Sequence, residues 1–286
     1  MSIRIIINAD DLGLSPEVNN EIDKAMECGY ITSTTILANT EYIEDVKKII
    51  KKHPKASFGI HLNLTQGKAI TNSDILRETG IVDKDNCFTG DARYITLFTR
   101  DVLNAIREEW TAQIMRLSDN GISISHIDGH HHIHSKFELQ CVLLEICKHF
   151  GIKKIRNRYS KPFSWKFCKK TPNQTHEVKN HTKKNNIVQP TPKRSNPKTS
   201  PIKYLLNSIK WYIRIKLSGC KTTKYFDSYA SCLKNLSTGK KYPKNCTVEL
   251  MCHPAHVNYI EEYNDICNRE IDNLIHDCKY ISYNEL

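Results

Sequence analysis

The sequence has no uninterrupted apolar stretch of about 18 residues, so it predicts no membrane-spanning helix. Its first apolar run, residues 5–7, is closely followed by Asp10 and Asp11 and is too short for the core of a signal peptide. The eleven cysteines include no C-x-x-C pair, which is the pattern of zinc ribbons and redox motifs. We therefore expect a cytoplasmic protein with reduced thiols.

Acidic residues are nearly missing from residues 153–224, which hold twenty Lys or Arg and a single acid, Glu177. This region carries +19, and the rest of the chain therefore carries −8, since the whole chain carries +11. Six of the ten prolines also lie there. We interpret residues 168–200 as a mobile basic insertion within one domain that spans 1–286, because they contain too few apolar residues to fold alone.

Short β-rich runs alternate with amphipathic segments elsewhere, the pattern typical of βα units and a parallel sheet. Ser15 and Pro16 are suited to begin the first helix as cap and first-turn residue. We expect strands over 3–8, 33–38, 56–64, 122–128, 152–157 and 246–252, with a short strand at the C-terminus. We expect helices over 16–28, 41–53, 100–119, 136–149, 202–217 and 261–277, and an irregular functional loop over 65–98. The predicted fold class is α/β, an incomplete TIM-like barrel.

Polar side chains gather where four of these strands end. Asp10 and Asp11 follow the first strand, His61 lies in the third, the run HIDGHHHIH occupies 126–134, and His253 follows VELMC. The carboxyl ends of parallel barrel strands share one rim, where active sites are built. In FGIHLNL, alternation places the apolar residues under the helices and turns His61 toward the interior.

Imidazole and carboxylate are ligands that suit Zn²⁺, Mn²⁺, Fe²⁺ or Co²⁺, and three protein ligands with an open position make a hydrolytic site. One of the adjacent aspartates can bind the ion while the other takes a proton from metal-bound water. For single members, a hydrogen-bonded core histidine and an aspartate turn are the ordinary structural alternatives.

Six motifs in order resemble the YdjC-like family, whose best-known member is chitooligosaccharide deacetylase. They are NADDLGLS, STT at 33–35, GIHLNLTQGKAI, HIDGHHHIH, the arginines of KIRNR and MCHPAH. The likeness spans most of the chain outside 160–240. It implies an incomplete TIM-like barrel with one divalent metal ion, Mg²⁺ or Zn²⁺, and removal of an N-acetyl group from a chitin-derived or related amino sugar. It also implies a homodimer.

The resemblance places the site residues one by one. The metal ligands fall on Asp11, His61 and His130, the first member of the triple histidine. The catalytic base falls on Asp10 and the general acid on His253, while Arg156 and Asp128 bind substrate or orient the base.

Two other functions stay open. A metal-dependent phosphoesterase normally needs a second metal and an early H-x-H, where this chain has two aspartates. A nucleic-acid-binding protein would use the basic region 153–224, which lacks regularly interleaved aromatics. We expect the apolar positions of the helix over 202–217 to be buried, with contact to an anionic membrane surface as the alternative.

Overall fold

The computed structural model describes residues 2–158, 201–254 and 260–286, so the expected insertion over 168–200 lies outside the described residues. Within these ranges seven strands form one sheet in which every pairing is parallel. The strands are β1 (Ile3–Leu12), β2 (Ser33–Ile36), β3 (Ser57–Leu62), β4 (Ile127–Gly129), β5 (Tyr225–Ser228), β6 (Thr247–Cys252) and β7 (Cys278–Tyr280).

The sheet runs in the order β4-β3-β2-β1-β6-β5, and β7 pairs with the first residues of β1. Between its two outer strands, Ile127 pairs with Ile155 and Lys154 with Lys221 as single parallel bridges. The expected strand over 152–157 is therefore reduced to these bridges. The curled parallel sheet confirms the α/β class and the incomplete TIM-like barrel.

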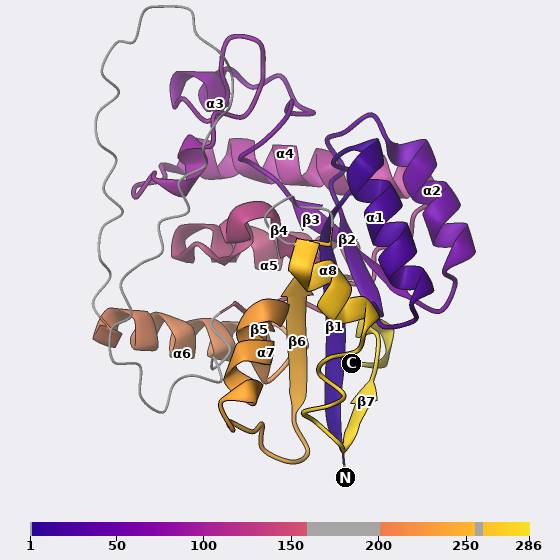
Figure 1. Ribbon diagram of the computed structural model, residues 1–286. Coiled ribbons are helices and arrows are strands. Elements are labelled where there is room, and N and C mark those ends of the chain that lie inside the picture. The colour runs from indigo at the N-terminus through magenta and orange to yellow at the C-terminus, as the bar shows by residue number, and fades with distance from the viewer. Residues whose placement is uncertain (1, 159–200, 255–259) are drawn as a thin grey trace, which may run out of the picture.

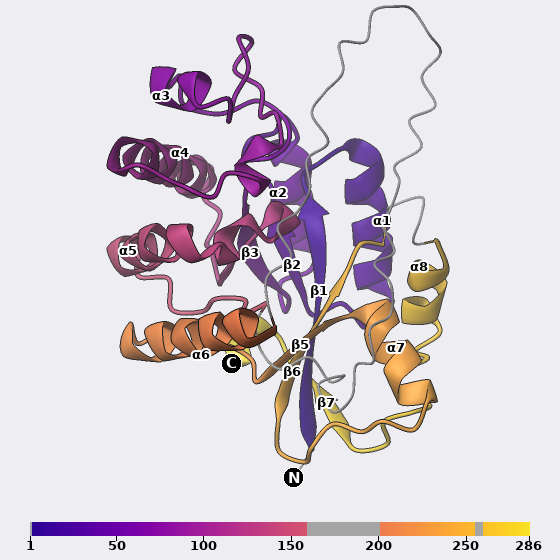
Figure 2. The ribbon, with the colours of Figure 1, turned by 90° about the vertical axis from the view of Figure 1, so that its left-hand side faces the viewer.

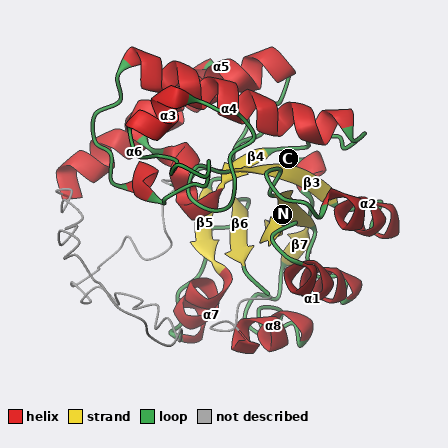
Figure 3. Ribbon diagram, turned by 90° about the horizontal axis from the view of Figure 1, so that it is seen from above, coloured by secondary structure: helices red, strands yellow, loops and turns green. Residues whose placement is uncertain are grey.

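Helices surround the outer side of this sheet, as Figures 1 and 2 show. They are α1 (Pro16–Glu27), α2 (Ile43–Lys52), α3 (Asp74–Glu78), α4 (Arg100–Asp119), α5 (Gln140–Phe150), α6 (Pro201–Leu217), α7 (Tyr229–Ser237) and α8 (Ile260–Cys267). The strand ends are encircled by helices in the view from above (Figure 3). Ser15 caps α1 by accepting from the backbone N–H of Val18, as the sequence predicts.

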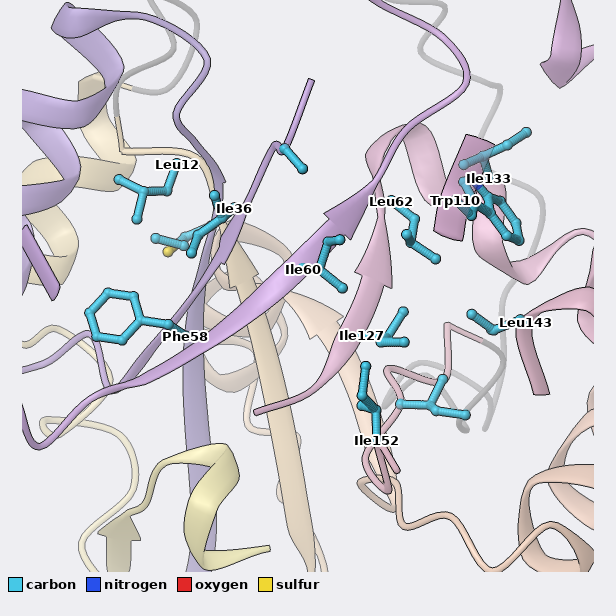
Figure 4. Packing of buried hydrophobic residues seen from close by; sticks show 14 of the residues in the cluster. Leu12, Ile36, Phe58, Ile60, Leu62, Trp110, Ile127, Ile133, Leu143 and Ile152 are labelled. Carbon is cyan, nitrogen blue, oxygen red and sulfur yellow. The ribbon is translucent and has the colours of Figure 1, made fainter. Parts of the chain in front are cut away.

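The core between β3, β4 and the helices follows the predicted alternation. Ile60 and Leu62 of β3 lie near Ile127 of β4 and face Trp110 of α4 and Leu143 of α5 (Figure 4). All five are buried. Because side chains alternate along a strand, this apolar face directs the intervening His61 toward the concave interior.

Close packing inside the barrel depends on Gly59 of β3. A Cβ there would lie 2.5 Å from Cε1 of the His126 ring. That ring stacks on Tyr283 with centroids 3.7 Å apart, and its Nε2 lies 3.1 Å from Oδ1 of Asn8. Glycine therefore makes room for an aromatic pair under the site.

The C-terminal half of the chain also differs from expectation. The helix predicted over 261–277 ends at Cys267, because Arg269 adopts a left-handed φ of 58° and the N–H groups of Arg269 and Glu270 bond back to Ile266 and Asp265. The pair β5–α7 was not predicted.

The helix α6 also differs, since its expected buried face is largely exposed. Leu206, Ile209, Tyr212, Ile213 and Leu217 are exposed, while Trp211 and Ile215 are buried. Among the described residues, no helix is both long enough and apolar enough to cross a membrane.

Candidate metal and catalytic centre

Two consecutive aspartates at the end of β1 face the same interior, although strand alternation would send them to opposite sides. The pairing of β1 with β2 shifts register between Ala9 and Leu12, and Asp11 has a left-handed φ of 72°. This bulge rotates the Asp11 side chain toward the histidines of β3 and of the segment after β4. A residue of the candidate site thus adopts a backbone conformation that is strained for an L-residue.

Three donor atoms converge at the strand ends. Asp11 Oδ1 lies 3.2 Å from Nε2 of His61 and 2.8 Å from Nδ1 of His130. Together these side chains form a cluster whose donor atoms could hold a metal ion. These are the three residues on which the family resemblance places the metal ligands, and the fold brings them together.

The outer nitrogen of each imidazole has a partner. His61 Nδ1 lies 2.6 Å from Asp128 Oδ1, and His130 Nε2 lies 3.0 Å from Gln66 Oε1. A carboxylate or amide oxygen accepts an N–H, so each neutral ring would turn a lone pair toward Asp11. This is the arrangement that metal-binding histidines need.

The charge of the site also fits a cation. Burial disfavours a charged His61, but the carboxylates around the ring outweigh burial and raise its pKa to about 10. Asp10, Asp11, Asp128 and Glu249 surround the interior, and Arg156 is the fixed cation among them. The excess negative charge is relieved either by a proton on His61 or by a bound metal ion.

Arg156 is fully buried and binds three carboxylates. Its Nη1 and Nη2 lie 2.7 and 2.6 Å from the two oxygens of Asp10, its Nη1 lies 2.8 Å from Asp128 Oδ2, and its Nε lies 2.6 Å from Glu249 Oε1. Burial raises the pKa of Asp10, but the guanidinium outweighs burial and lowers that pKa to about 2. Arg156 therefore holds Asp10 ionised and in a fixed plane.

Several polar residues of this network were not predicted from the sequence. Asn8 Nδ2 donates to Asp10 Oδ1 at 2.8 Å, and Thr35 Oγ1 donates to Asp128 Oδ2 at 3.0 Å. Tyr283 donates its hydroxyl to Glu249. The only sequence signal for Glu249 is an acidic residue inside the apolar strand TVELMC.

His253 approaches the centre from β6. Its Nε2 lies 4.0 Å from Asp11 Oδ2, and its backbone N–H donates to Glu262 Oε2 of α8 at 2.9 Å. The imidazole keeps about a quarter of its surface exposed, 26%. It is thus close to the cluster and open to solvent.

The remaining members of the histidine run point elsewhere. His131 Nδ1 lies 2.9 Å from Thr65 Oγ1, and His134 Nε2 donates to the carbonyl oxygen of Arg156 at 3.3 Å. Burial lowers the pKa of His134 to about 3. His134 therefore supports the Arg156 segment as a neutral ring, and of the triple histidine His130 belongs to the donor cluster.

The fold and centre define a class of protein, an incomplete parallel α/β barrel with a carboxylate–imidazole cluster on its rim. The chain belongs to the YdjC-like family, whose profile, described as YdjC-like protein, matches residues 4–280. This confirms the resemblance found in the sequence motifs.

Several relatives are named carbohydrate deacetylase. One from Oceanobacillus iheyensis is 35% identical over 150 residues, which cover 52% of this chain and 63% of the relative. One from Halalkalibacterium halodurans is 35% identical over 134 residues, which cover 46% of this chain and 55% of the relative. The matches thus span less than two thirds of either relative.

A solved structure from Enterococcus faecalis, described as a candidate cellobiose-phosphate cleavage protein, superposes with a TM-score of 0.70. It is 20% identical in sequence, and the superposition covers 100% of this chain and 99% of that one. At this identity the likeness supports the fold.

Proposed function

We propose that the chain is a metal-dependent carbohydrate deacetylase, a hydrolase that removes the N-acetyl group of a chitooligosaccharide or a related amino sugar. The observation that carries the proposal is the convergence of Asp11, His61 and His130 beside the arginine-paired Asp10. The carbohydrate deacetylases among its relatives support the same chemistry.

Asp11, His61 and His130 would hold one divalent ion through one oxygen and two nitrogens. This donor set favours Zn²⁺ or a similar transition metal over Mg²⁺, which prefers oxygen ligands. A bound ion of this kind supplies Lewis acidity, which polarises the amide carbonyl and acidifies the attacking water.

Asp10 is the residue that we assign to accept the proton of the attacking water. Its two hydrogen bonds to Arg156 fix the carboxylate plane, so no rotamer has to be ordered during the reaction. The lowered pKa keeps Asp10 ionised at neutral pH and also makes it a weak base. We therefore expect it to hold the proton only briefly.

His253 is the residue that we assign to protonate the leaving amine. Its Nε2 approaches Asp11 Oδ2, whereas the two ligand histidines contact Asp11 Oδ1. Its partial exposure lets it exchange protons with solvent, which a general acid needs after each turnover.

A phosphoesterase with two metal ions is the alternative that the interior argues against. Asp10, His61 and Asp128 form a second group with metal-binding geometry. Arg156 Nη1 already lies 2.7 Å from Asp10 and 2.8 Å from Asp128, so a guanidinium occupies the position of a second cation. The remaining donors, on Asp11, His61 and His130, can therefore bind a single metal ion.

The sequence predicts further properties of the protein. A cytoplasmic location, a homodimer and a single domain with a basic insertion rest on the sequence. A nucleic-acid or anionic-surface contact through 153–224 involves residues that lie mostly outside the described ranges.

Mass spectrometry of products tests the proposal directly. The protein is incubated with N-acetylglucosamine oligomers of different length, with and without chelator, and we expect loss of acetyl groups that chelation abolishes. His61→Ala should abolish it too, while His149→Ala, which changes an exposed histidine of α5, should not. Acetyl release that survives both the chelator and His61→Ala would exclude the proposed metal chemistry.

A further inference from the structure

Two cysteines from opposite ends of the chain meet on the surface of the barrel. Cys28 caps the C-terminus of α1, and Cys267 is the last residue of α8. Their Sγ atoms lie 2.9 Å apart. The two helices lie side by side in Figures 2 and 3. This distance is shorter than an ordinary van der Waals contact between two sulfur atoms, and the S–S bond of a disulfide is about 2.05 Å long. A small displacement would therefore suffice to join the two residues.

The surroundings of the pair allow oxidation. Both side chains are only partly buried, so a small oxidant can reach them. Cys28 Sγ lies 3.5 Å from the carbonyl oxygen of Lys24, and Arg269 Nη2 donates to the carbonyl oxygen of Cys28 at 3.4 Å. The Arg269 side chain thus links the backbone of Cys28 to the segment that follows α8.

The two sulfurs are not equivalent. Burial and the neighbouring Cys28 raise the pKa of Cys267 to about 11. A thiol with so high a pKa is rarely ionised at neutral pH, so Cys267 is a poor first nucleophile. Cys267 then acts second, after Cys28 is already covalently modified.

We propose that Cys28 and Cys267 are a reversible oxidation site that forms an intramolecular disulfide with a low-molecular-weight disulfide such as oxidised glutathione. The Cys28 sulfur attacks one sulfur of the oxidant, and the first small thiol leaves with the electron pair. The Cys267 sulfur then attacks the Cys28 sulfur of the mixed disulfide and expels the second small thiol. The two protons lost by the protein thiols are taken up by the two departing thiolates, so the protein is oxidised and the small disulfide reduced.

The bond would fasten the helix that supports His253. Glu262 of α8 accepts the backbone N–H of His253, and the disulfide ties the last residue of the same helix to α1. It would also close a loop that contains most of the chain, which restricts the unfolded state. Oxidation therefore stabilises the barrel and α8 together, whether or not the proposed deacetylation is correct.

Non-reducing peptide mapping tests this. The folded full-length protein is equilibrated in glutathione buffers of increasing potential, its free thiols are alkylated, and peptides are identified by mass spectrometry. We expect a peptide in which Cys28 and Cys267 are joined, and a melting temperature that rises on oxidation and falls again with dithiothreitol.

Matched variants decide the result. Cys28→Ser and Cys267→Ser should each abolish the joined peptide and the shift in melting temperature, while Cys141→Ser, at an exposed cysteine of α5, should keep both. Circular dichroism confirms that the variants are folded. Two outcomes would overturn the proposal. One is that glutathione stays on Cys28 in the wild type, as it should in Cys267→Ser. The other is that Cys28 and Cys267 both remain reduced, and are therefore alkylated, at potentials where Cys141 forms a mixed disulfide.

Discussion

Asp10 and Arg156 are joined by two parallel hydrogen bonds, at 2.7 and 2.6 Å, and both side chains are buried. A fork of this kind fixes the plane of the carboxylate as well as its position. Asp10 cannot turn toward an ion without breaking it. The neighbouring Asp11, rotated by its left-handed backbone, is the aspartate that faces His61 and His130.

Asp10→Asn tests this division of roles. We expect the variant to keep its metal ion, because the three proposed ligands are unchanged, and to lose about 10² to 10⁴ in turnover, as removal of a general base does. Elemental analysis and initial rates on an acetylated sugar measure the two effects. Loss of the ion in Asp10→Asn, with retention in Asp11→Asn, would show that the roles are reversed.

Asp128→Asn tests the support of His61. The asparagine side chain has one oxygen where Asp128 has two. If that oxygen accepts from His61 Nδ1, the NH₂ group faces the Arg156 guanidinium, and two hydrogen-bond donors then oppose each other. We therefore expect metal affinity to fall by about 10- to 100-fold, the usual cost of removing such a partner. Calorimetric titration with Zn²⁺ measures it, with His149→Ala as the control. Unchanged affinity would mean that Asp128 does not set the orientation of His61.

The backbone at Asp11 gives a prediction on stability. A φ of 72° is sterically unfavourable for an L-residue, whereas glycine adopts it without this free-energy cost. In chelator, Asp11→Gly should be more stable than Asp11→Ala by about 1 to 2 kcal/mol, although both lack the carboxylate. Urea denaturation compares them. Equal stabilities would mean that the bulge relaxes in the variants.

Much of the site was predictable because it lies on strands with strong patterns. Alternation in FGIHLNL places His61 inside the barrel, and parallel strands bring Asp11 and His130 to the same rim. Both predictions follow from the alternation of side chains along a strand and from the parallel direction of the strands, and short stretches of sequence are enough to indicate them.

The rest depends on contacts that no local pattern encodes. Tyr283 follows β7 and donates to Glu249 of β6, and the two residues meet because both strands pair with β1. The end of α8 was missed because Arg269, rather than glycine, adopts the left-handed position. The left-handed backbone at Asp11 could not be predicted either, because this position also holds a residue other than glycine.

Glu249 differs from Asp10 although both bind Arg156. Burial raises the pKa of Glu249 to about 6 from 4.5, because the guanidinium and the Tyr283 hydroxyl only partly offset burial. A raised carboxyl pKa means that the folded protein holds the proton more tightly than the unfolded chain. The resulting stability is fully present below about pH 4.5 and is lost as the pH rises through about 6.

Glu249→Gln should remove this pH dependence. The shift of about 1.5 units corresponds to about 2 kcal/mol, so the stability of the wild type relative to Glu249→Gln should be greater at pH 4.5 than at pH 7.5 by that order. Urea denaturation in chelator at the two pH values measures the difference. Tyr283→Phe is the matched control: it keeps an ionisable Glu249 but removes a hydrogen bond that lowers its pKa, so the dependence should persist and move to higher pH. A stability gap between wild type and Glu249→Gln that stays constant from pH 4.5 to 7.5 would show that Glu249 does not titrate in this range, and that Arg156 holds it ionised as it holds Asp10.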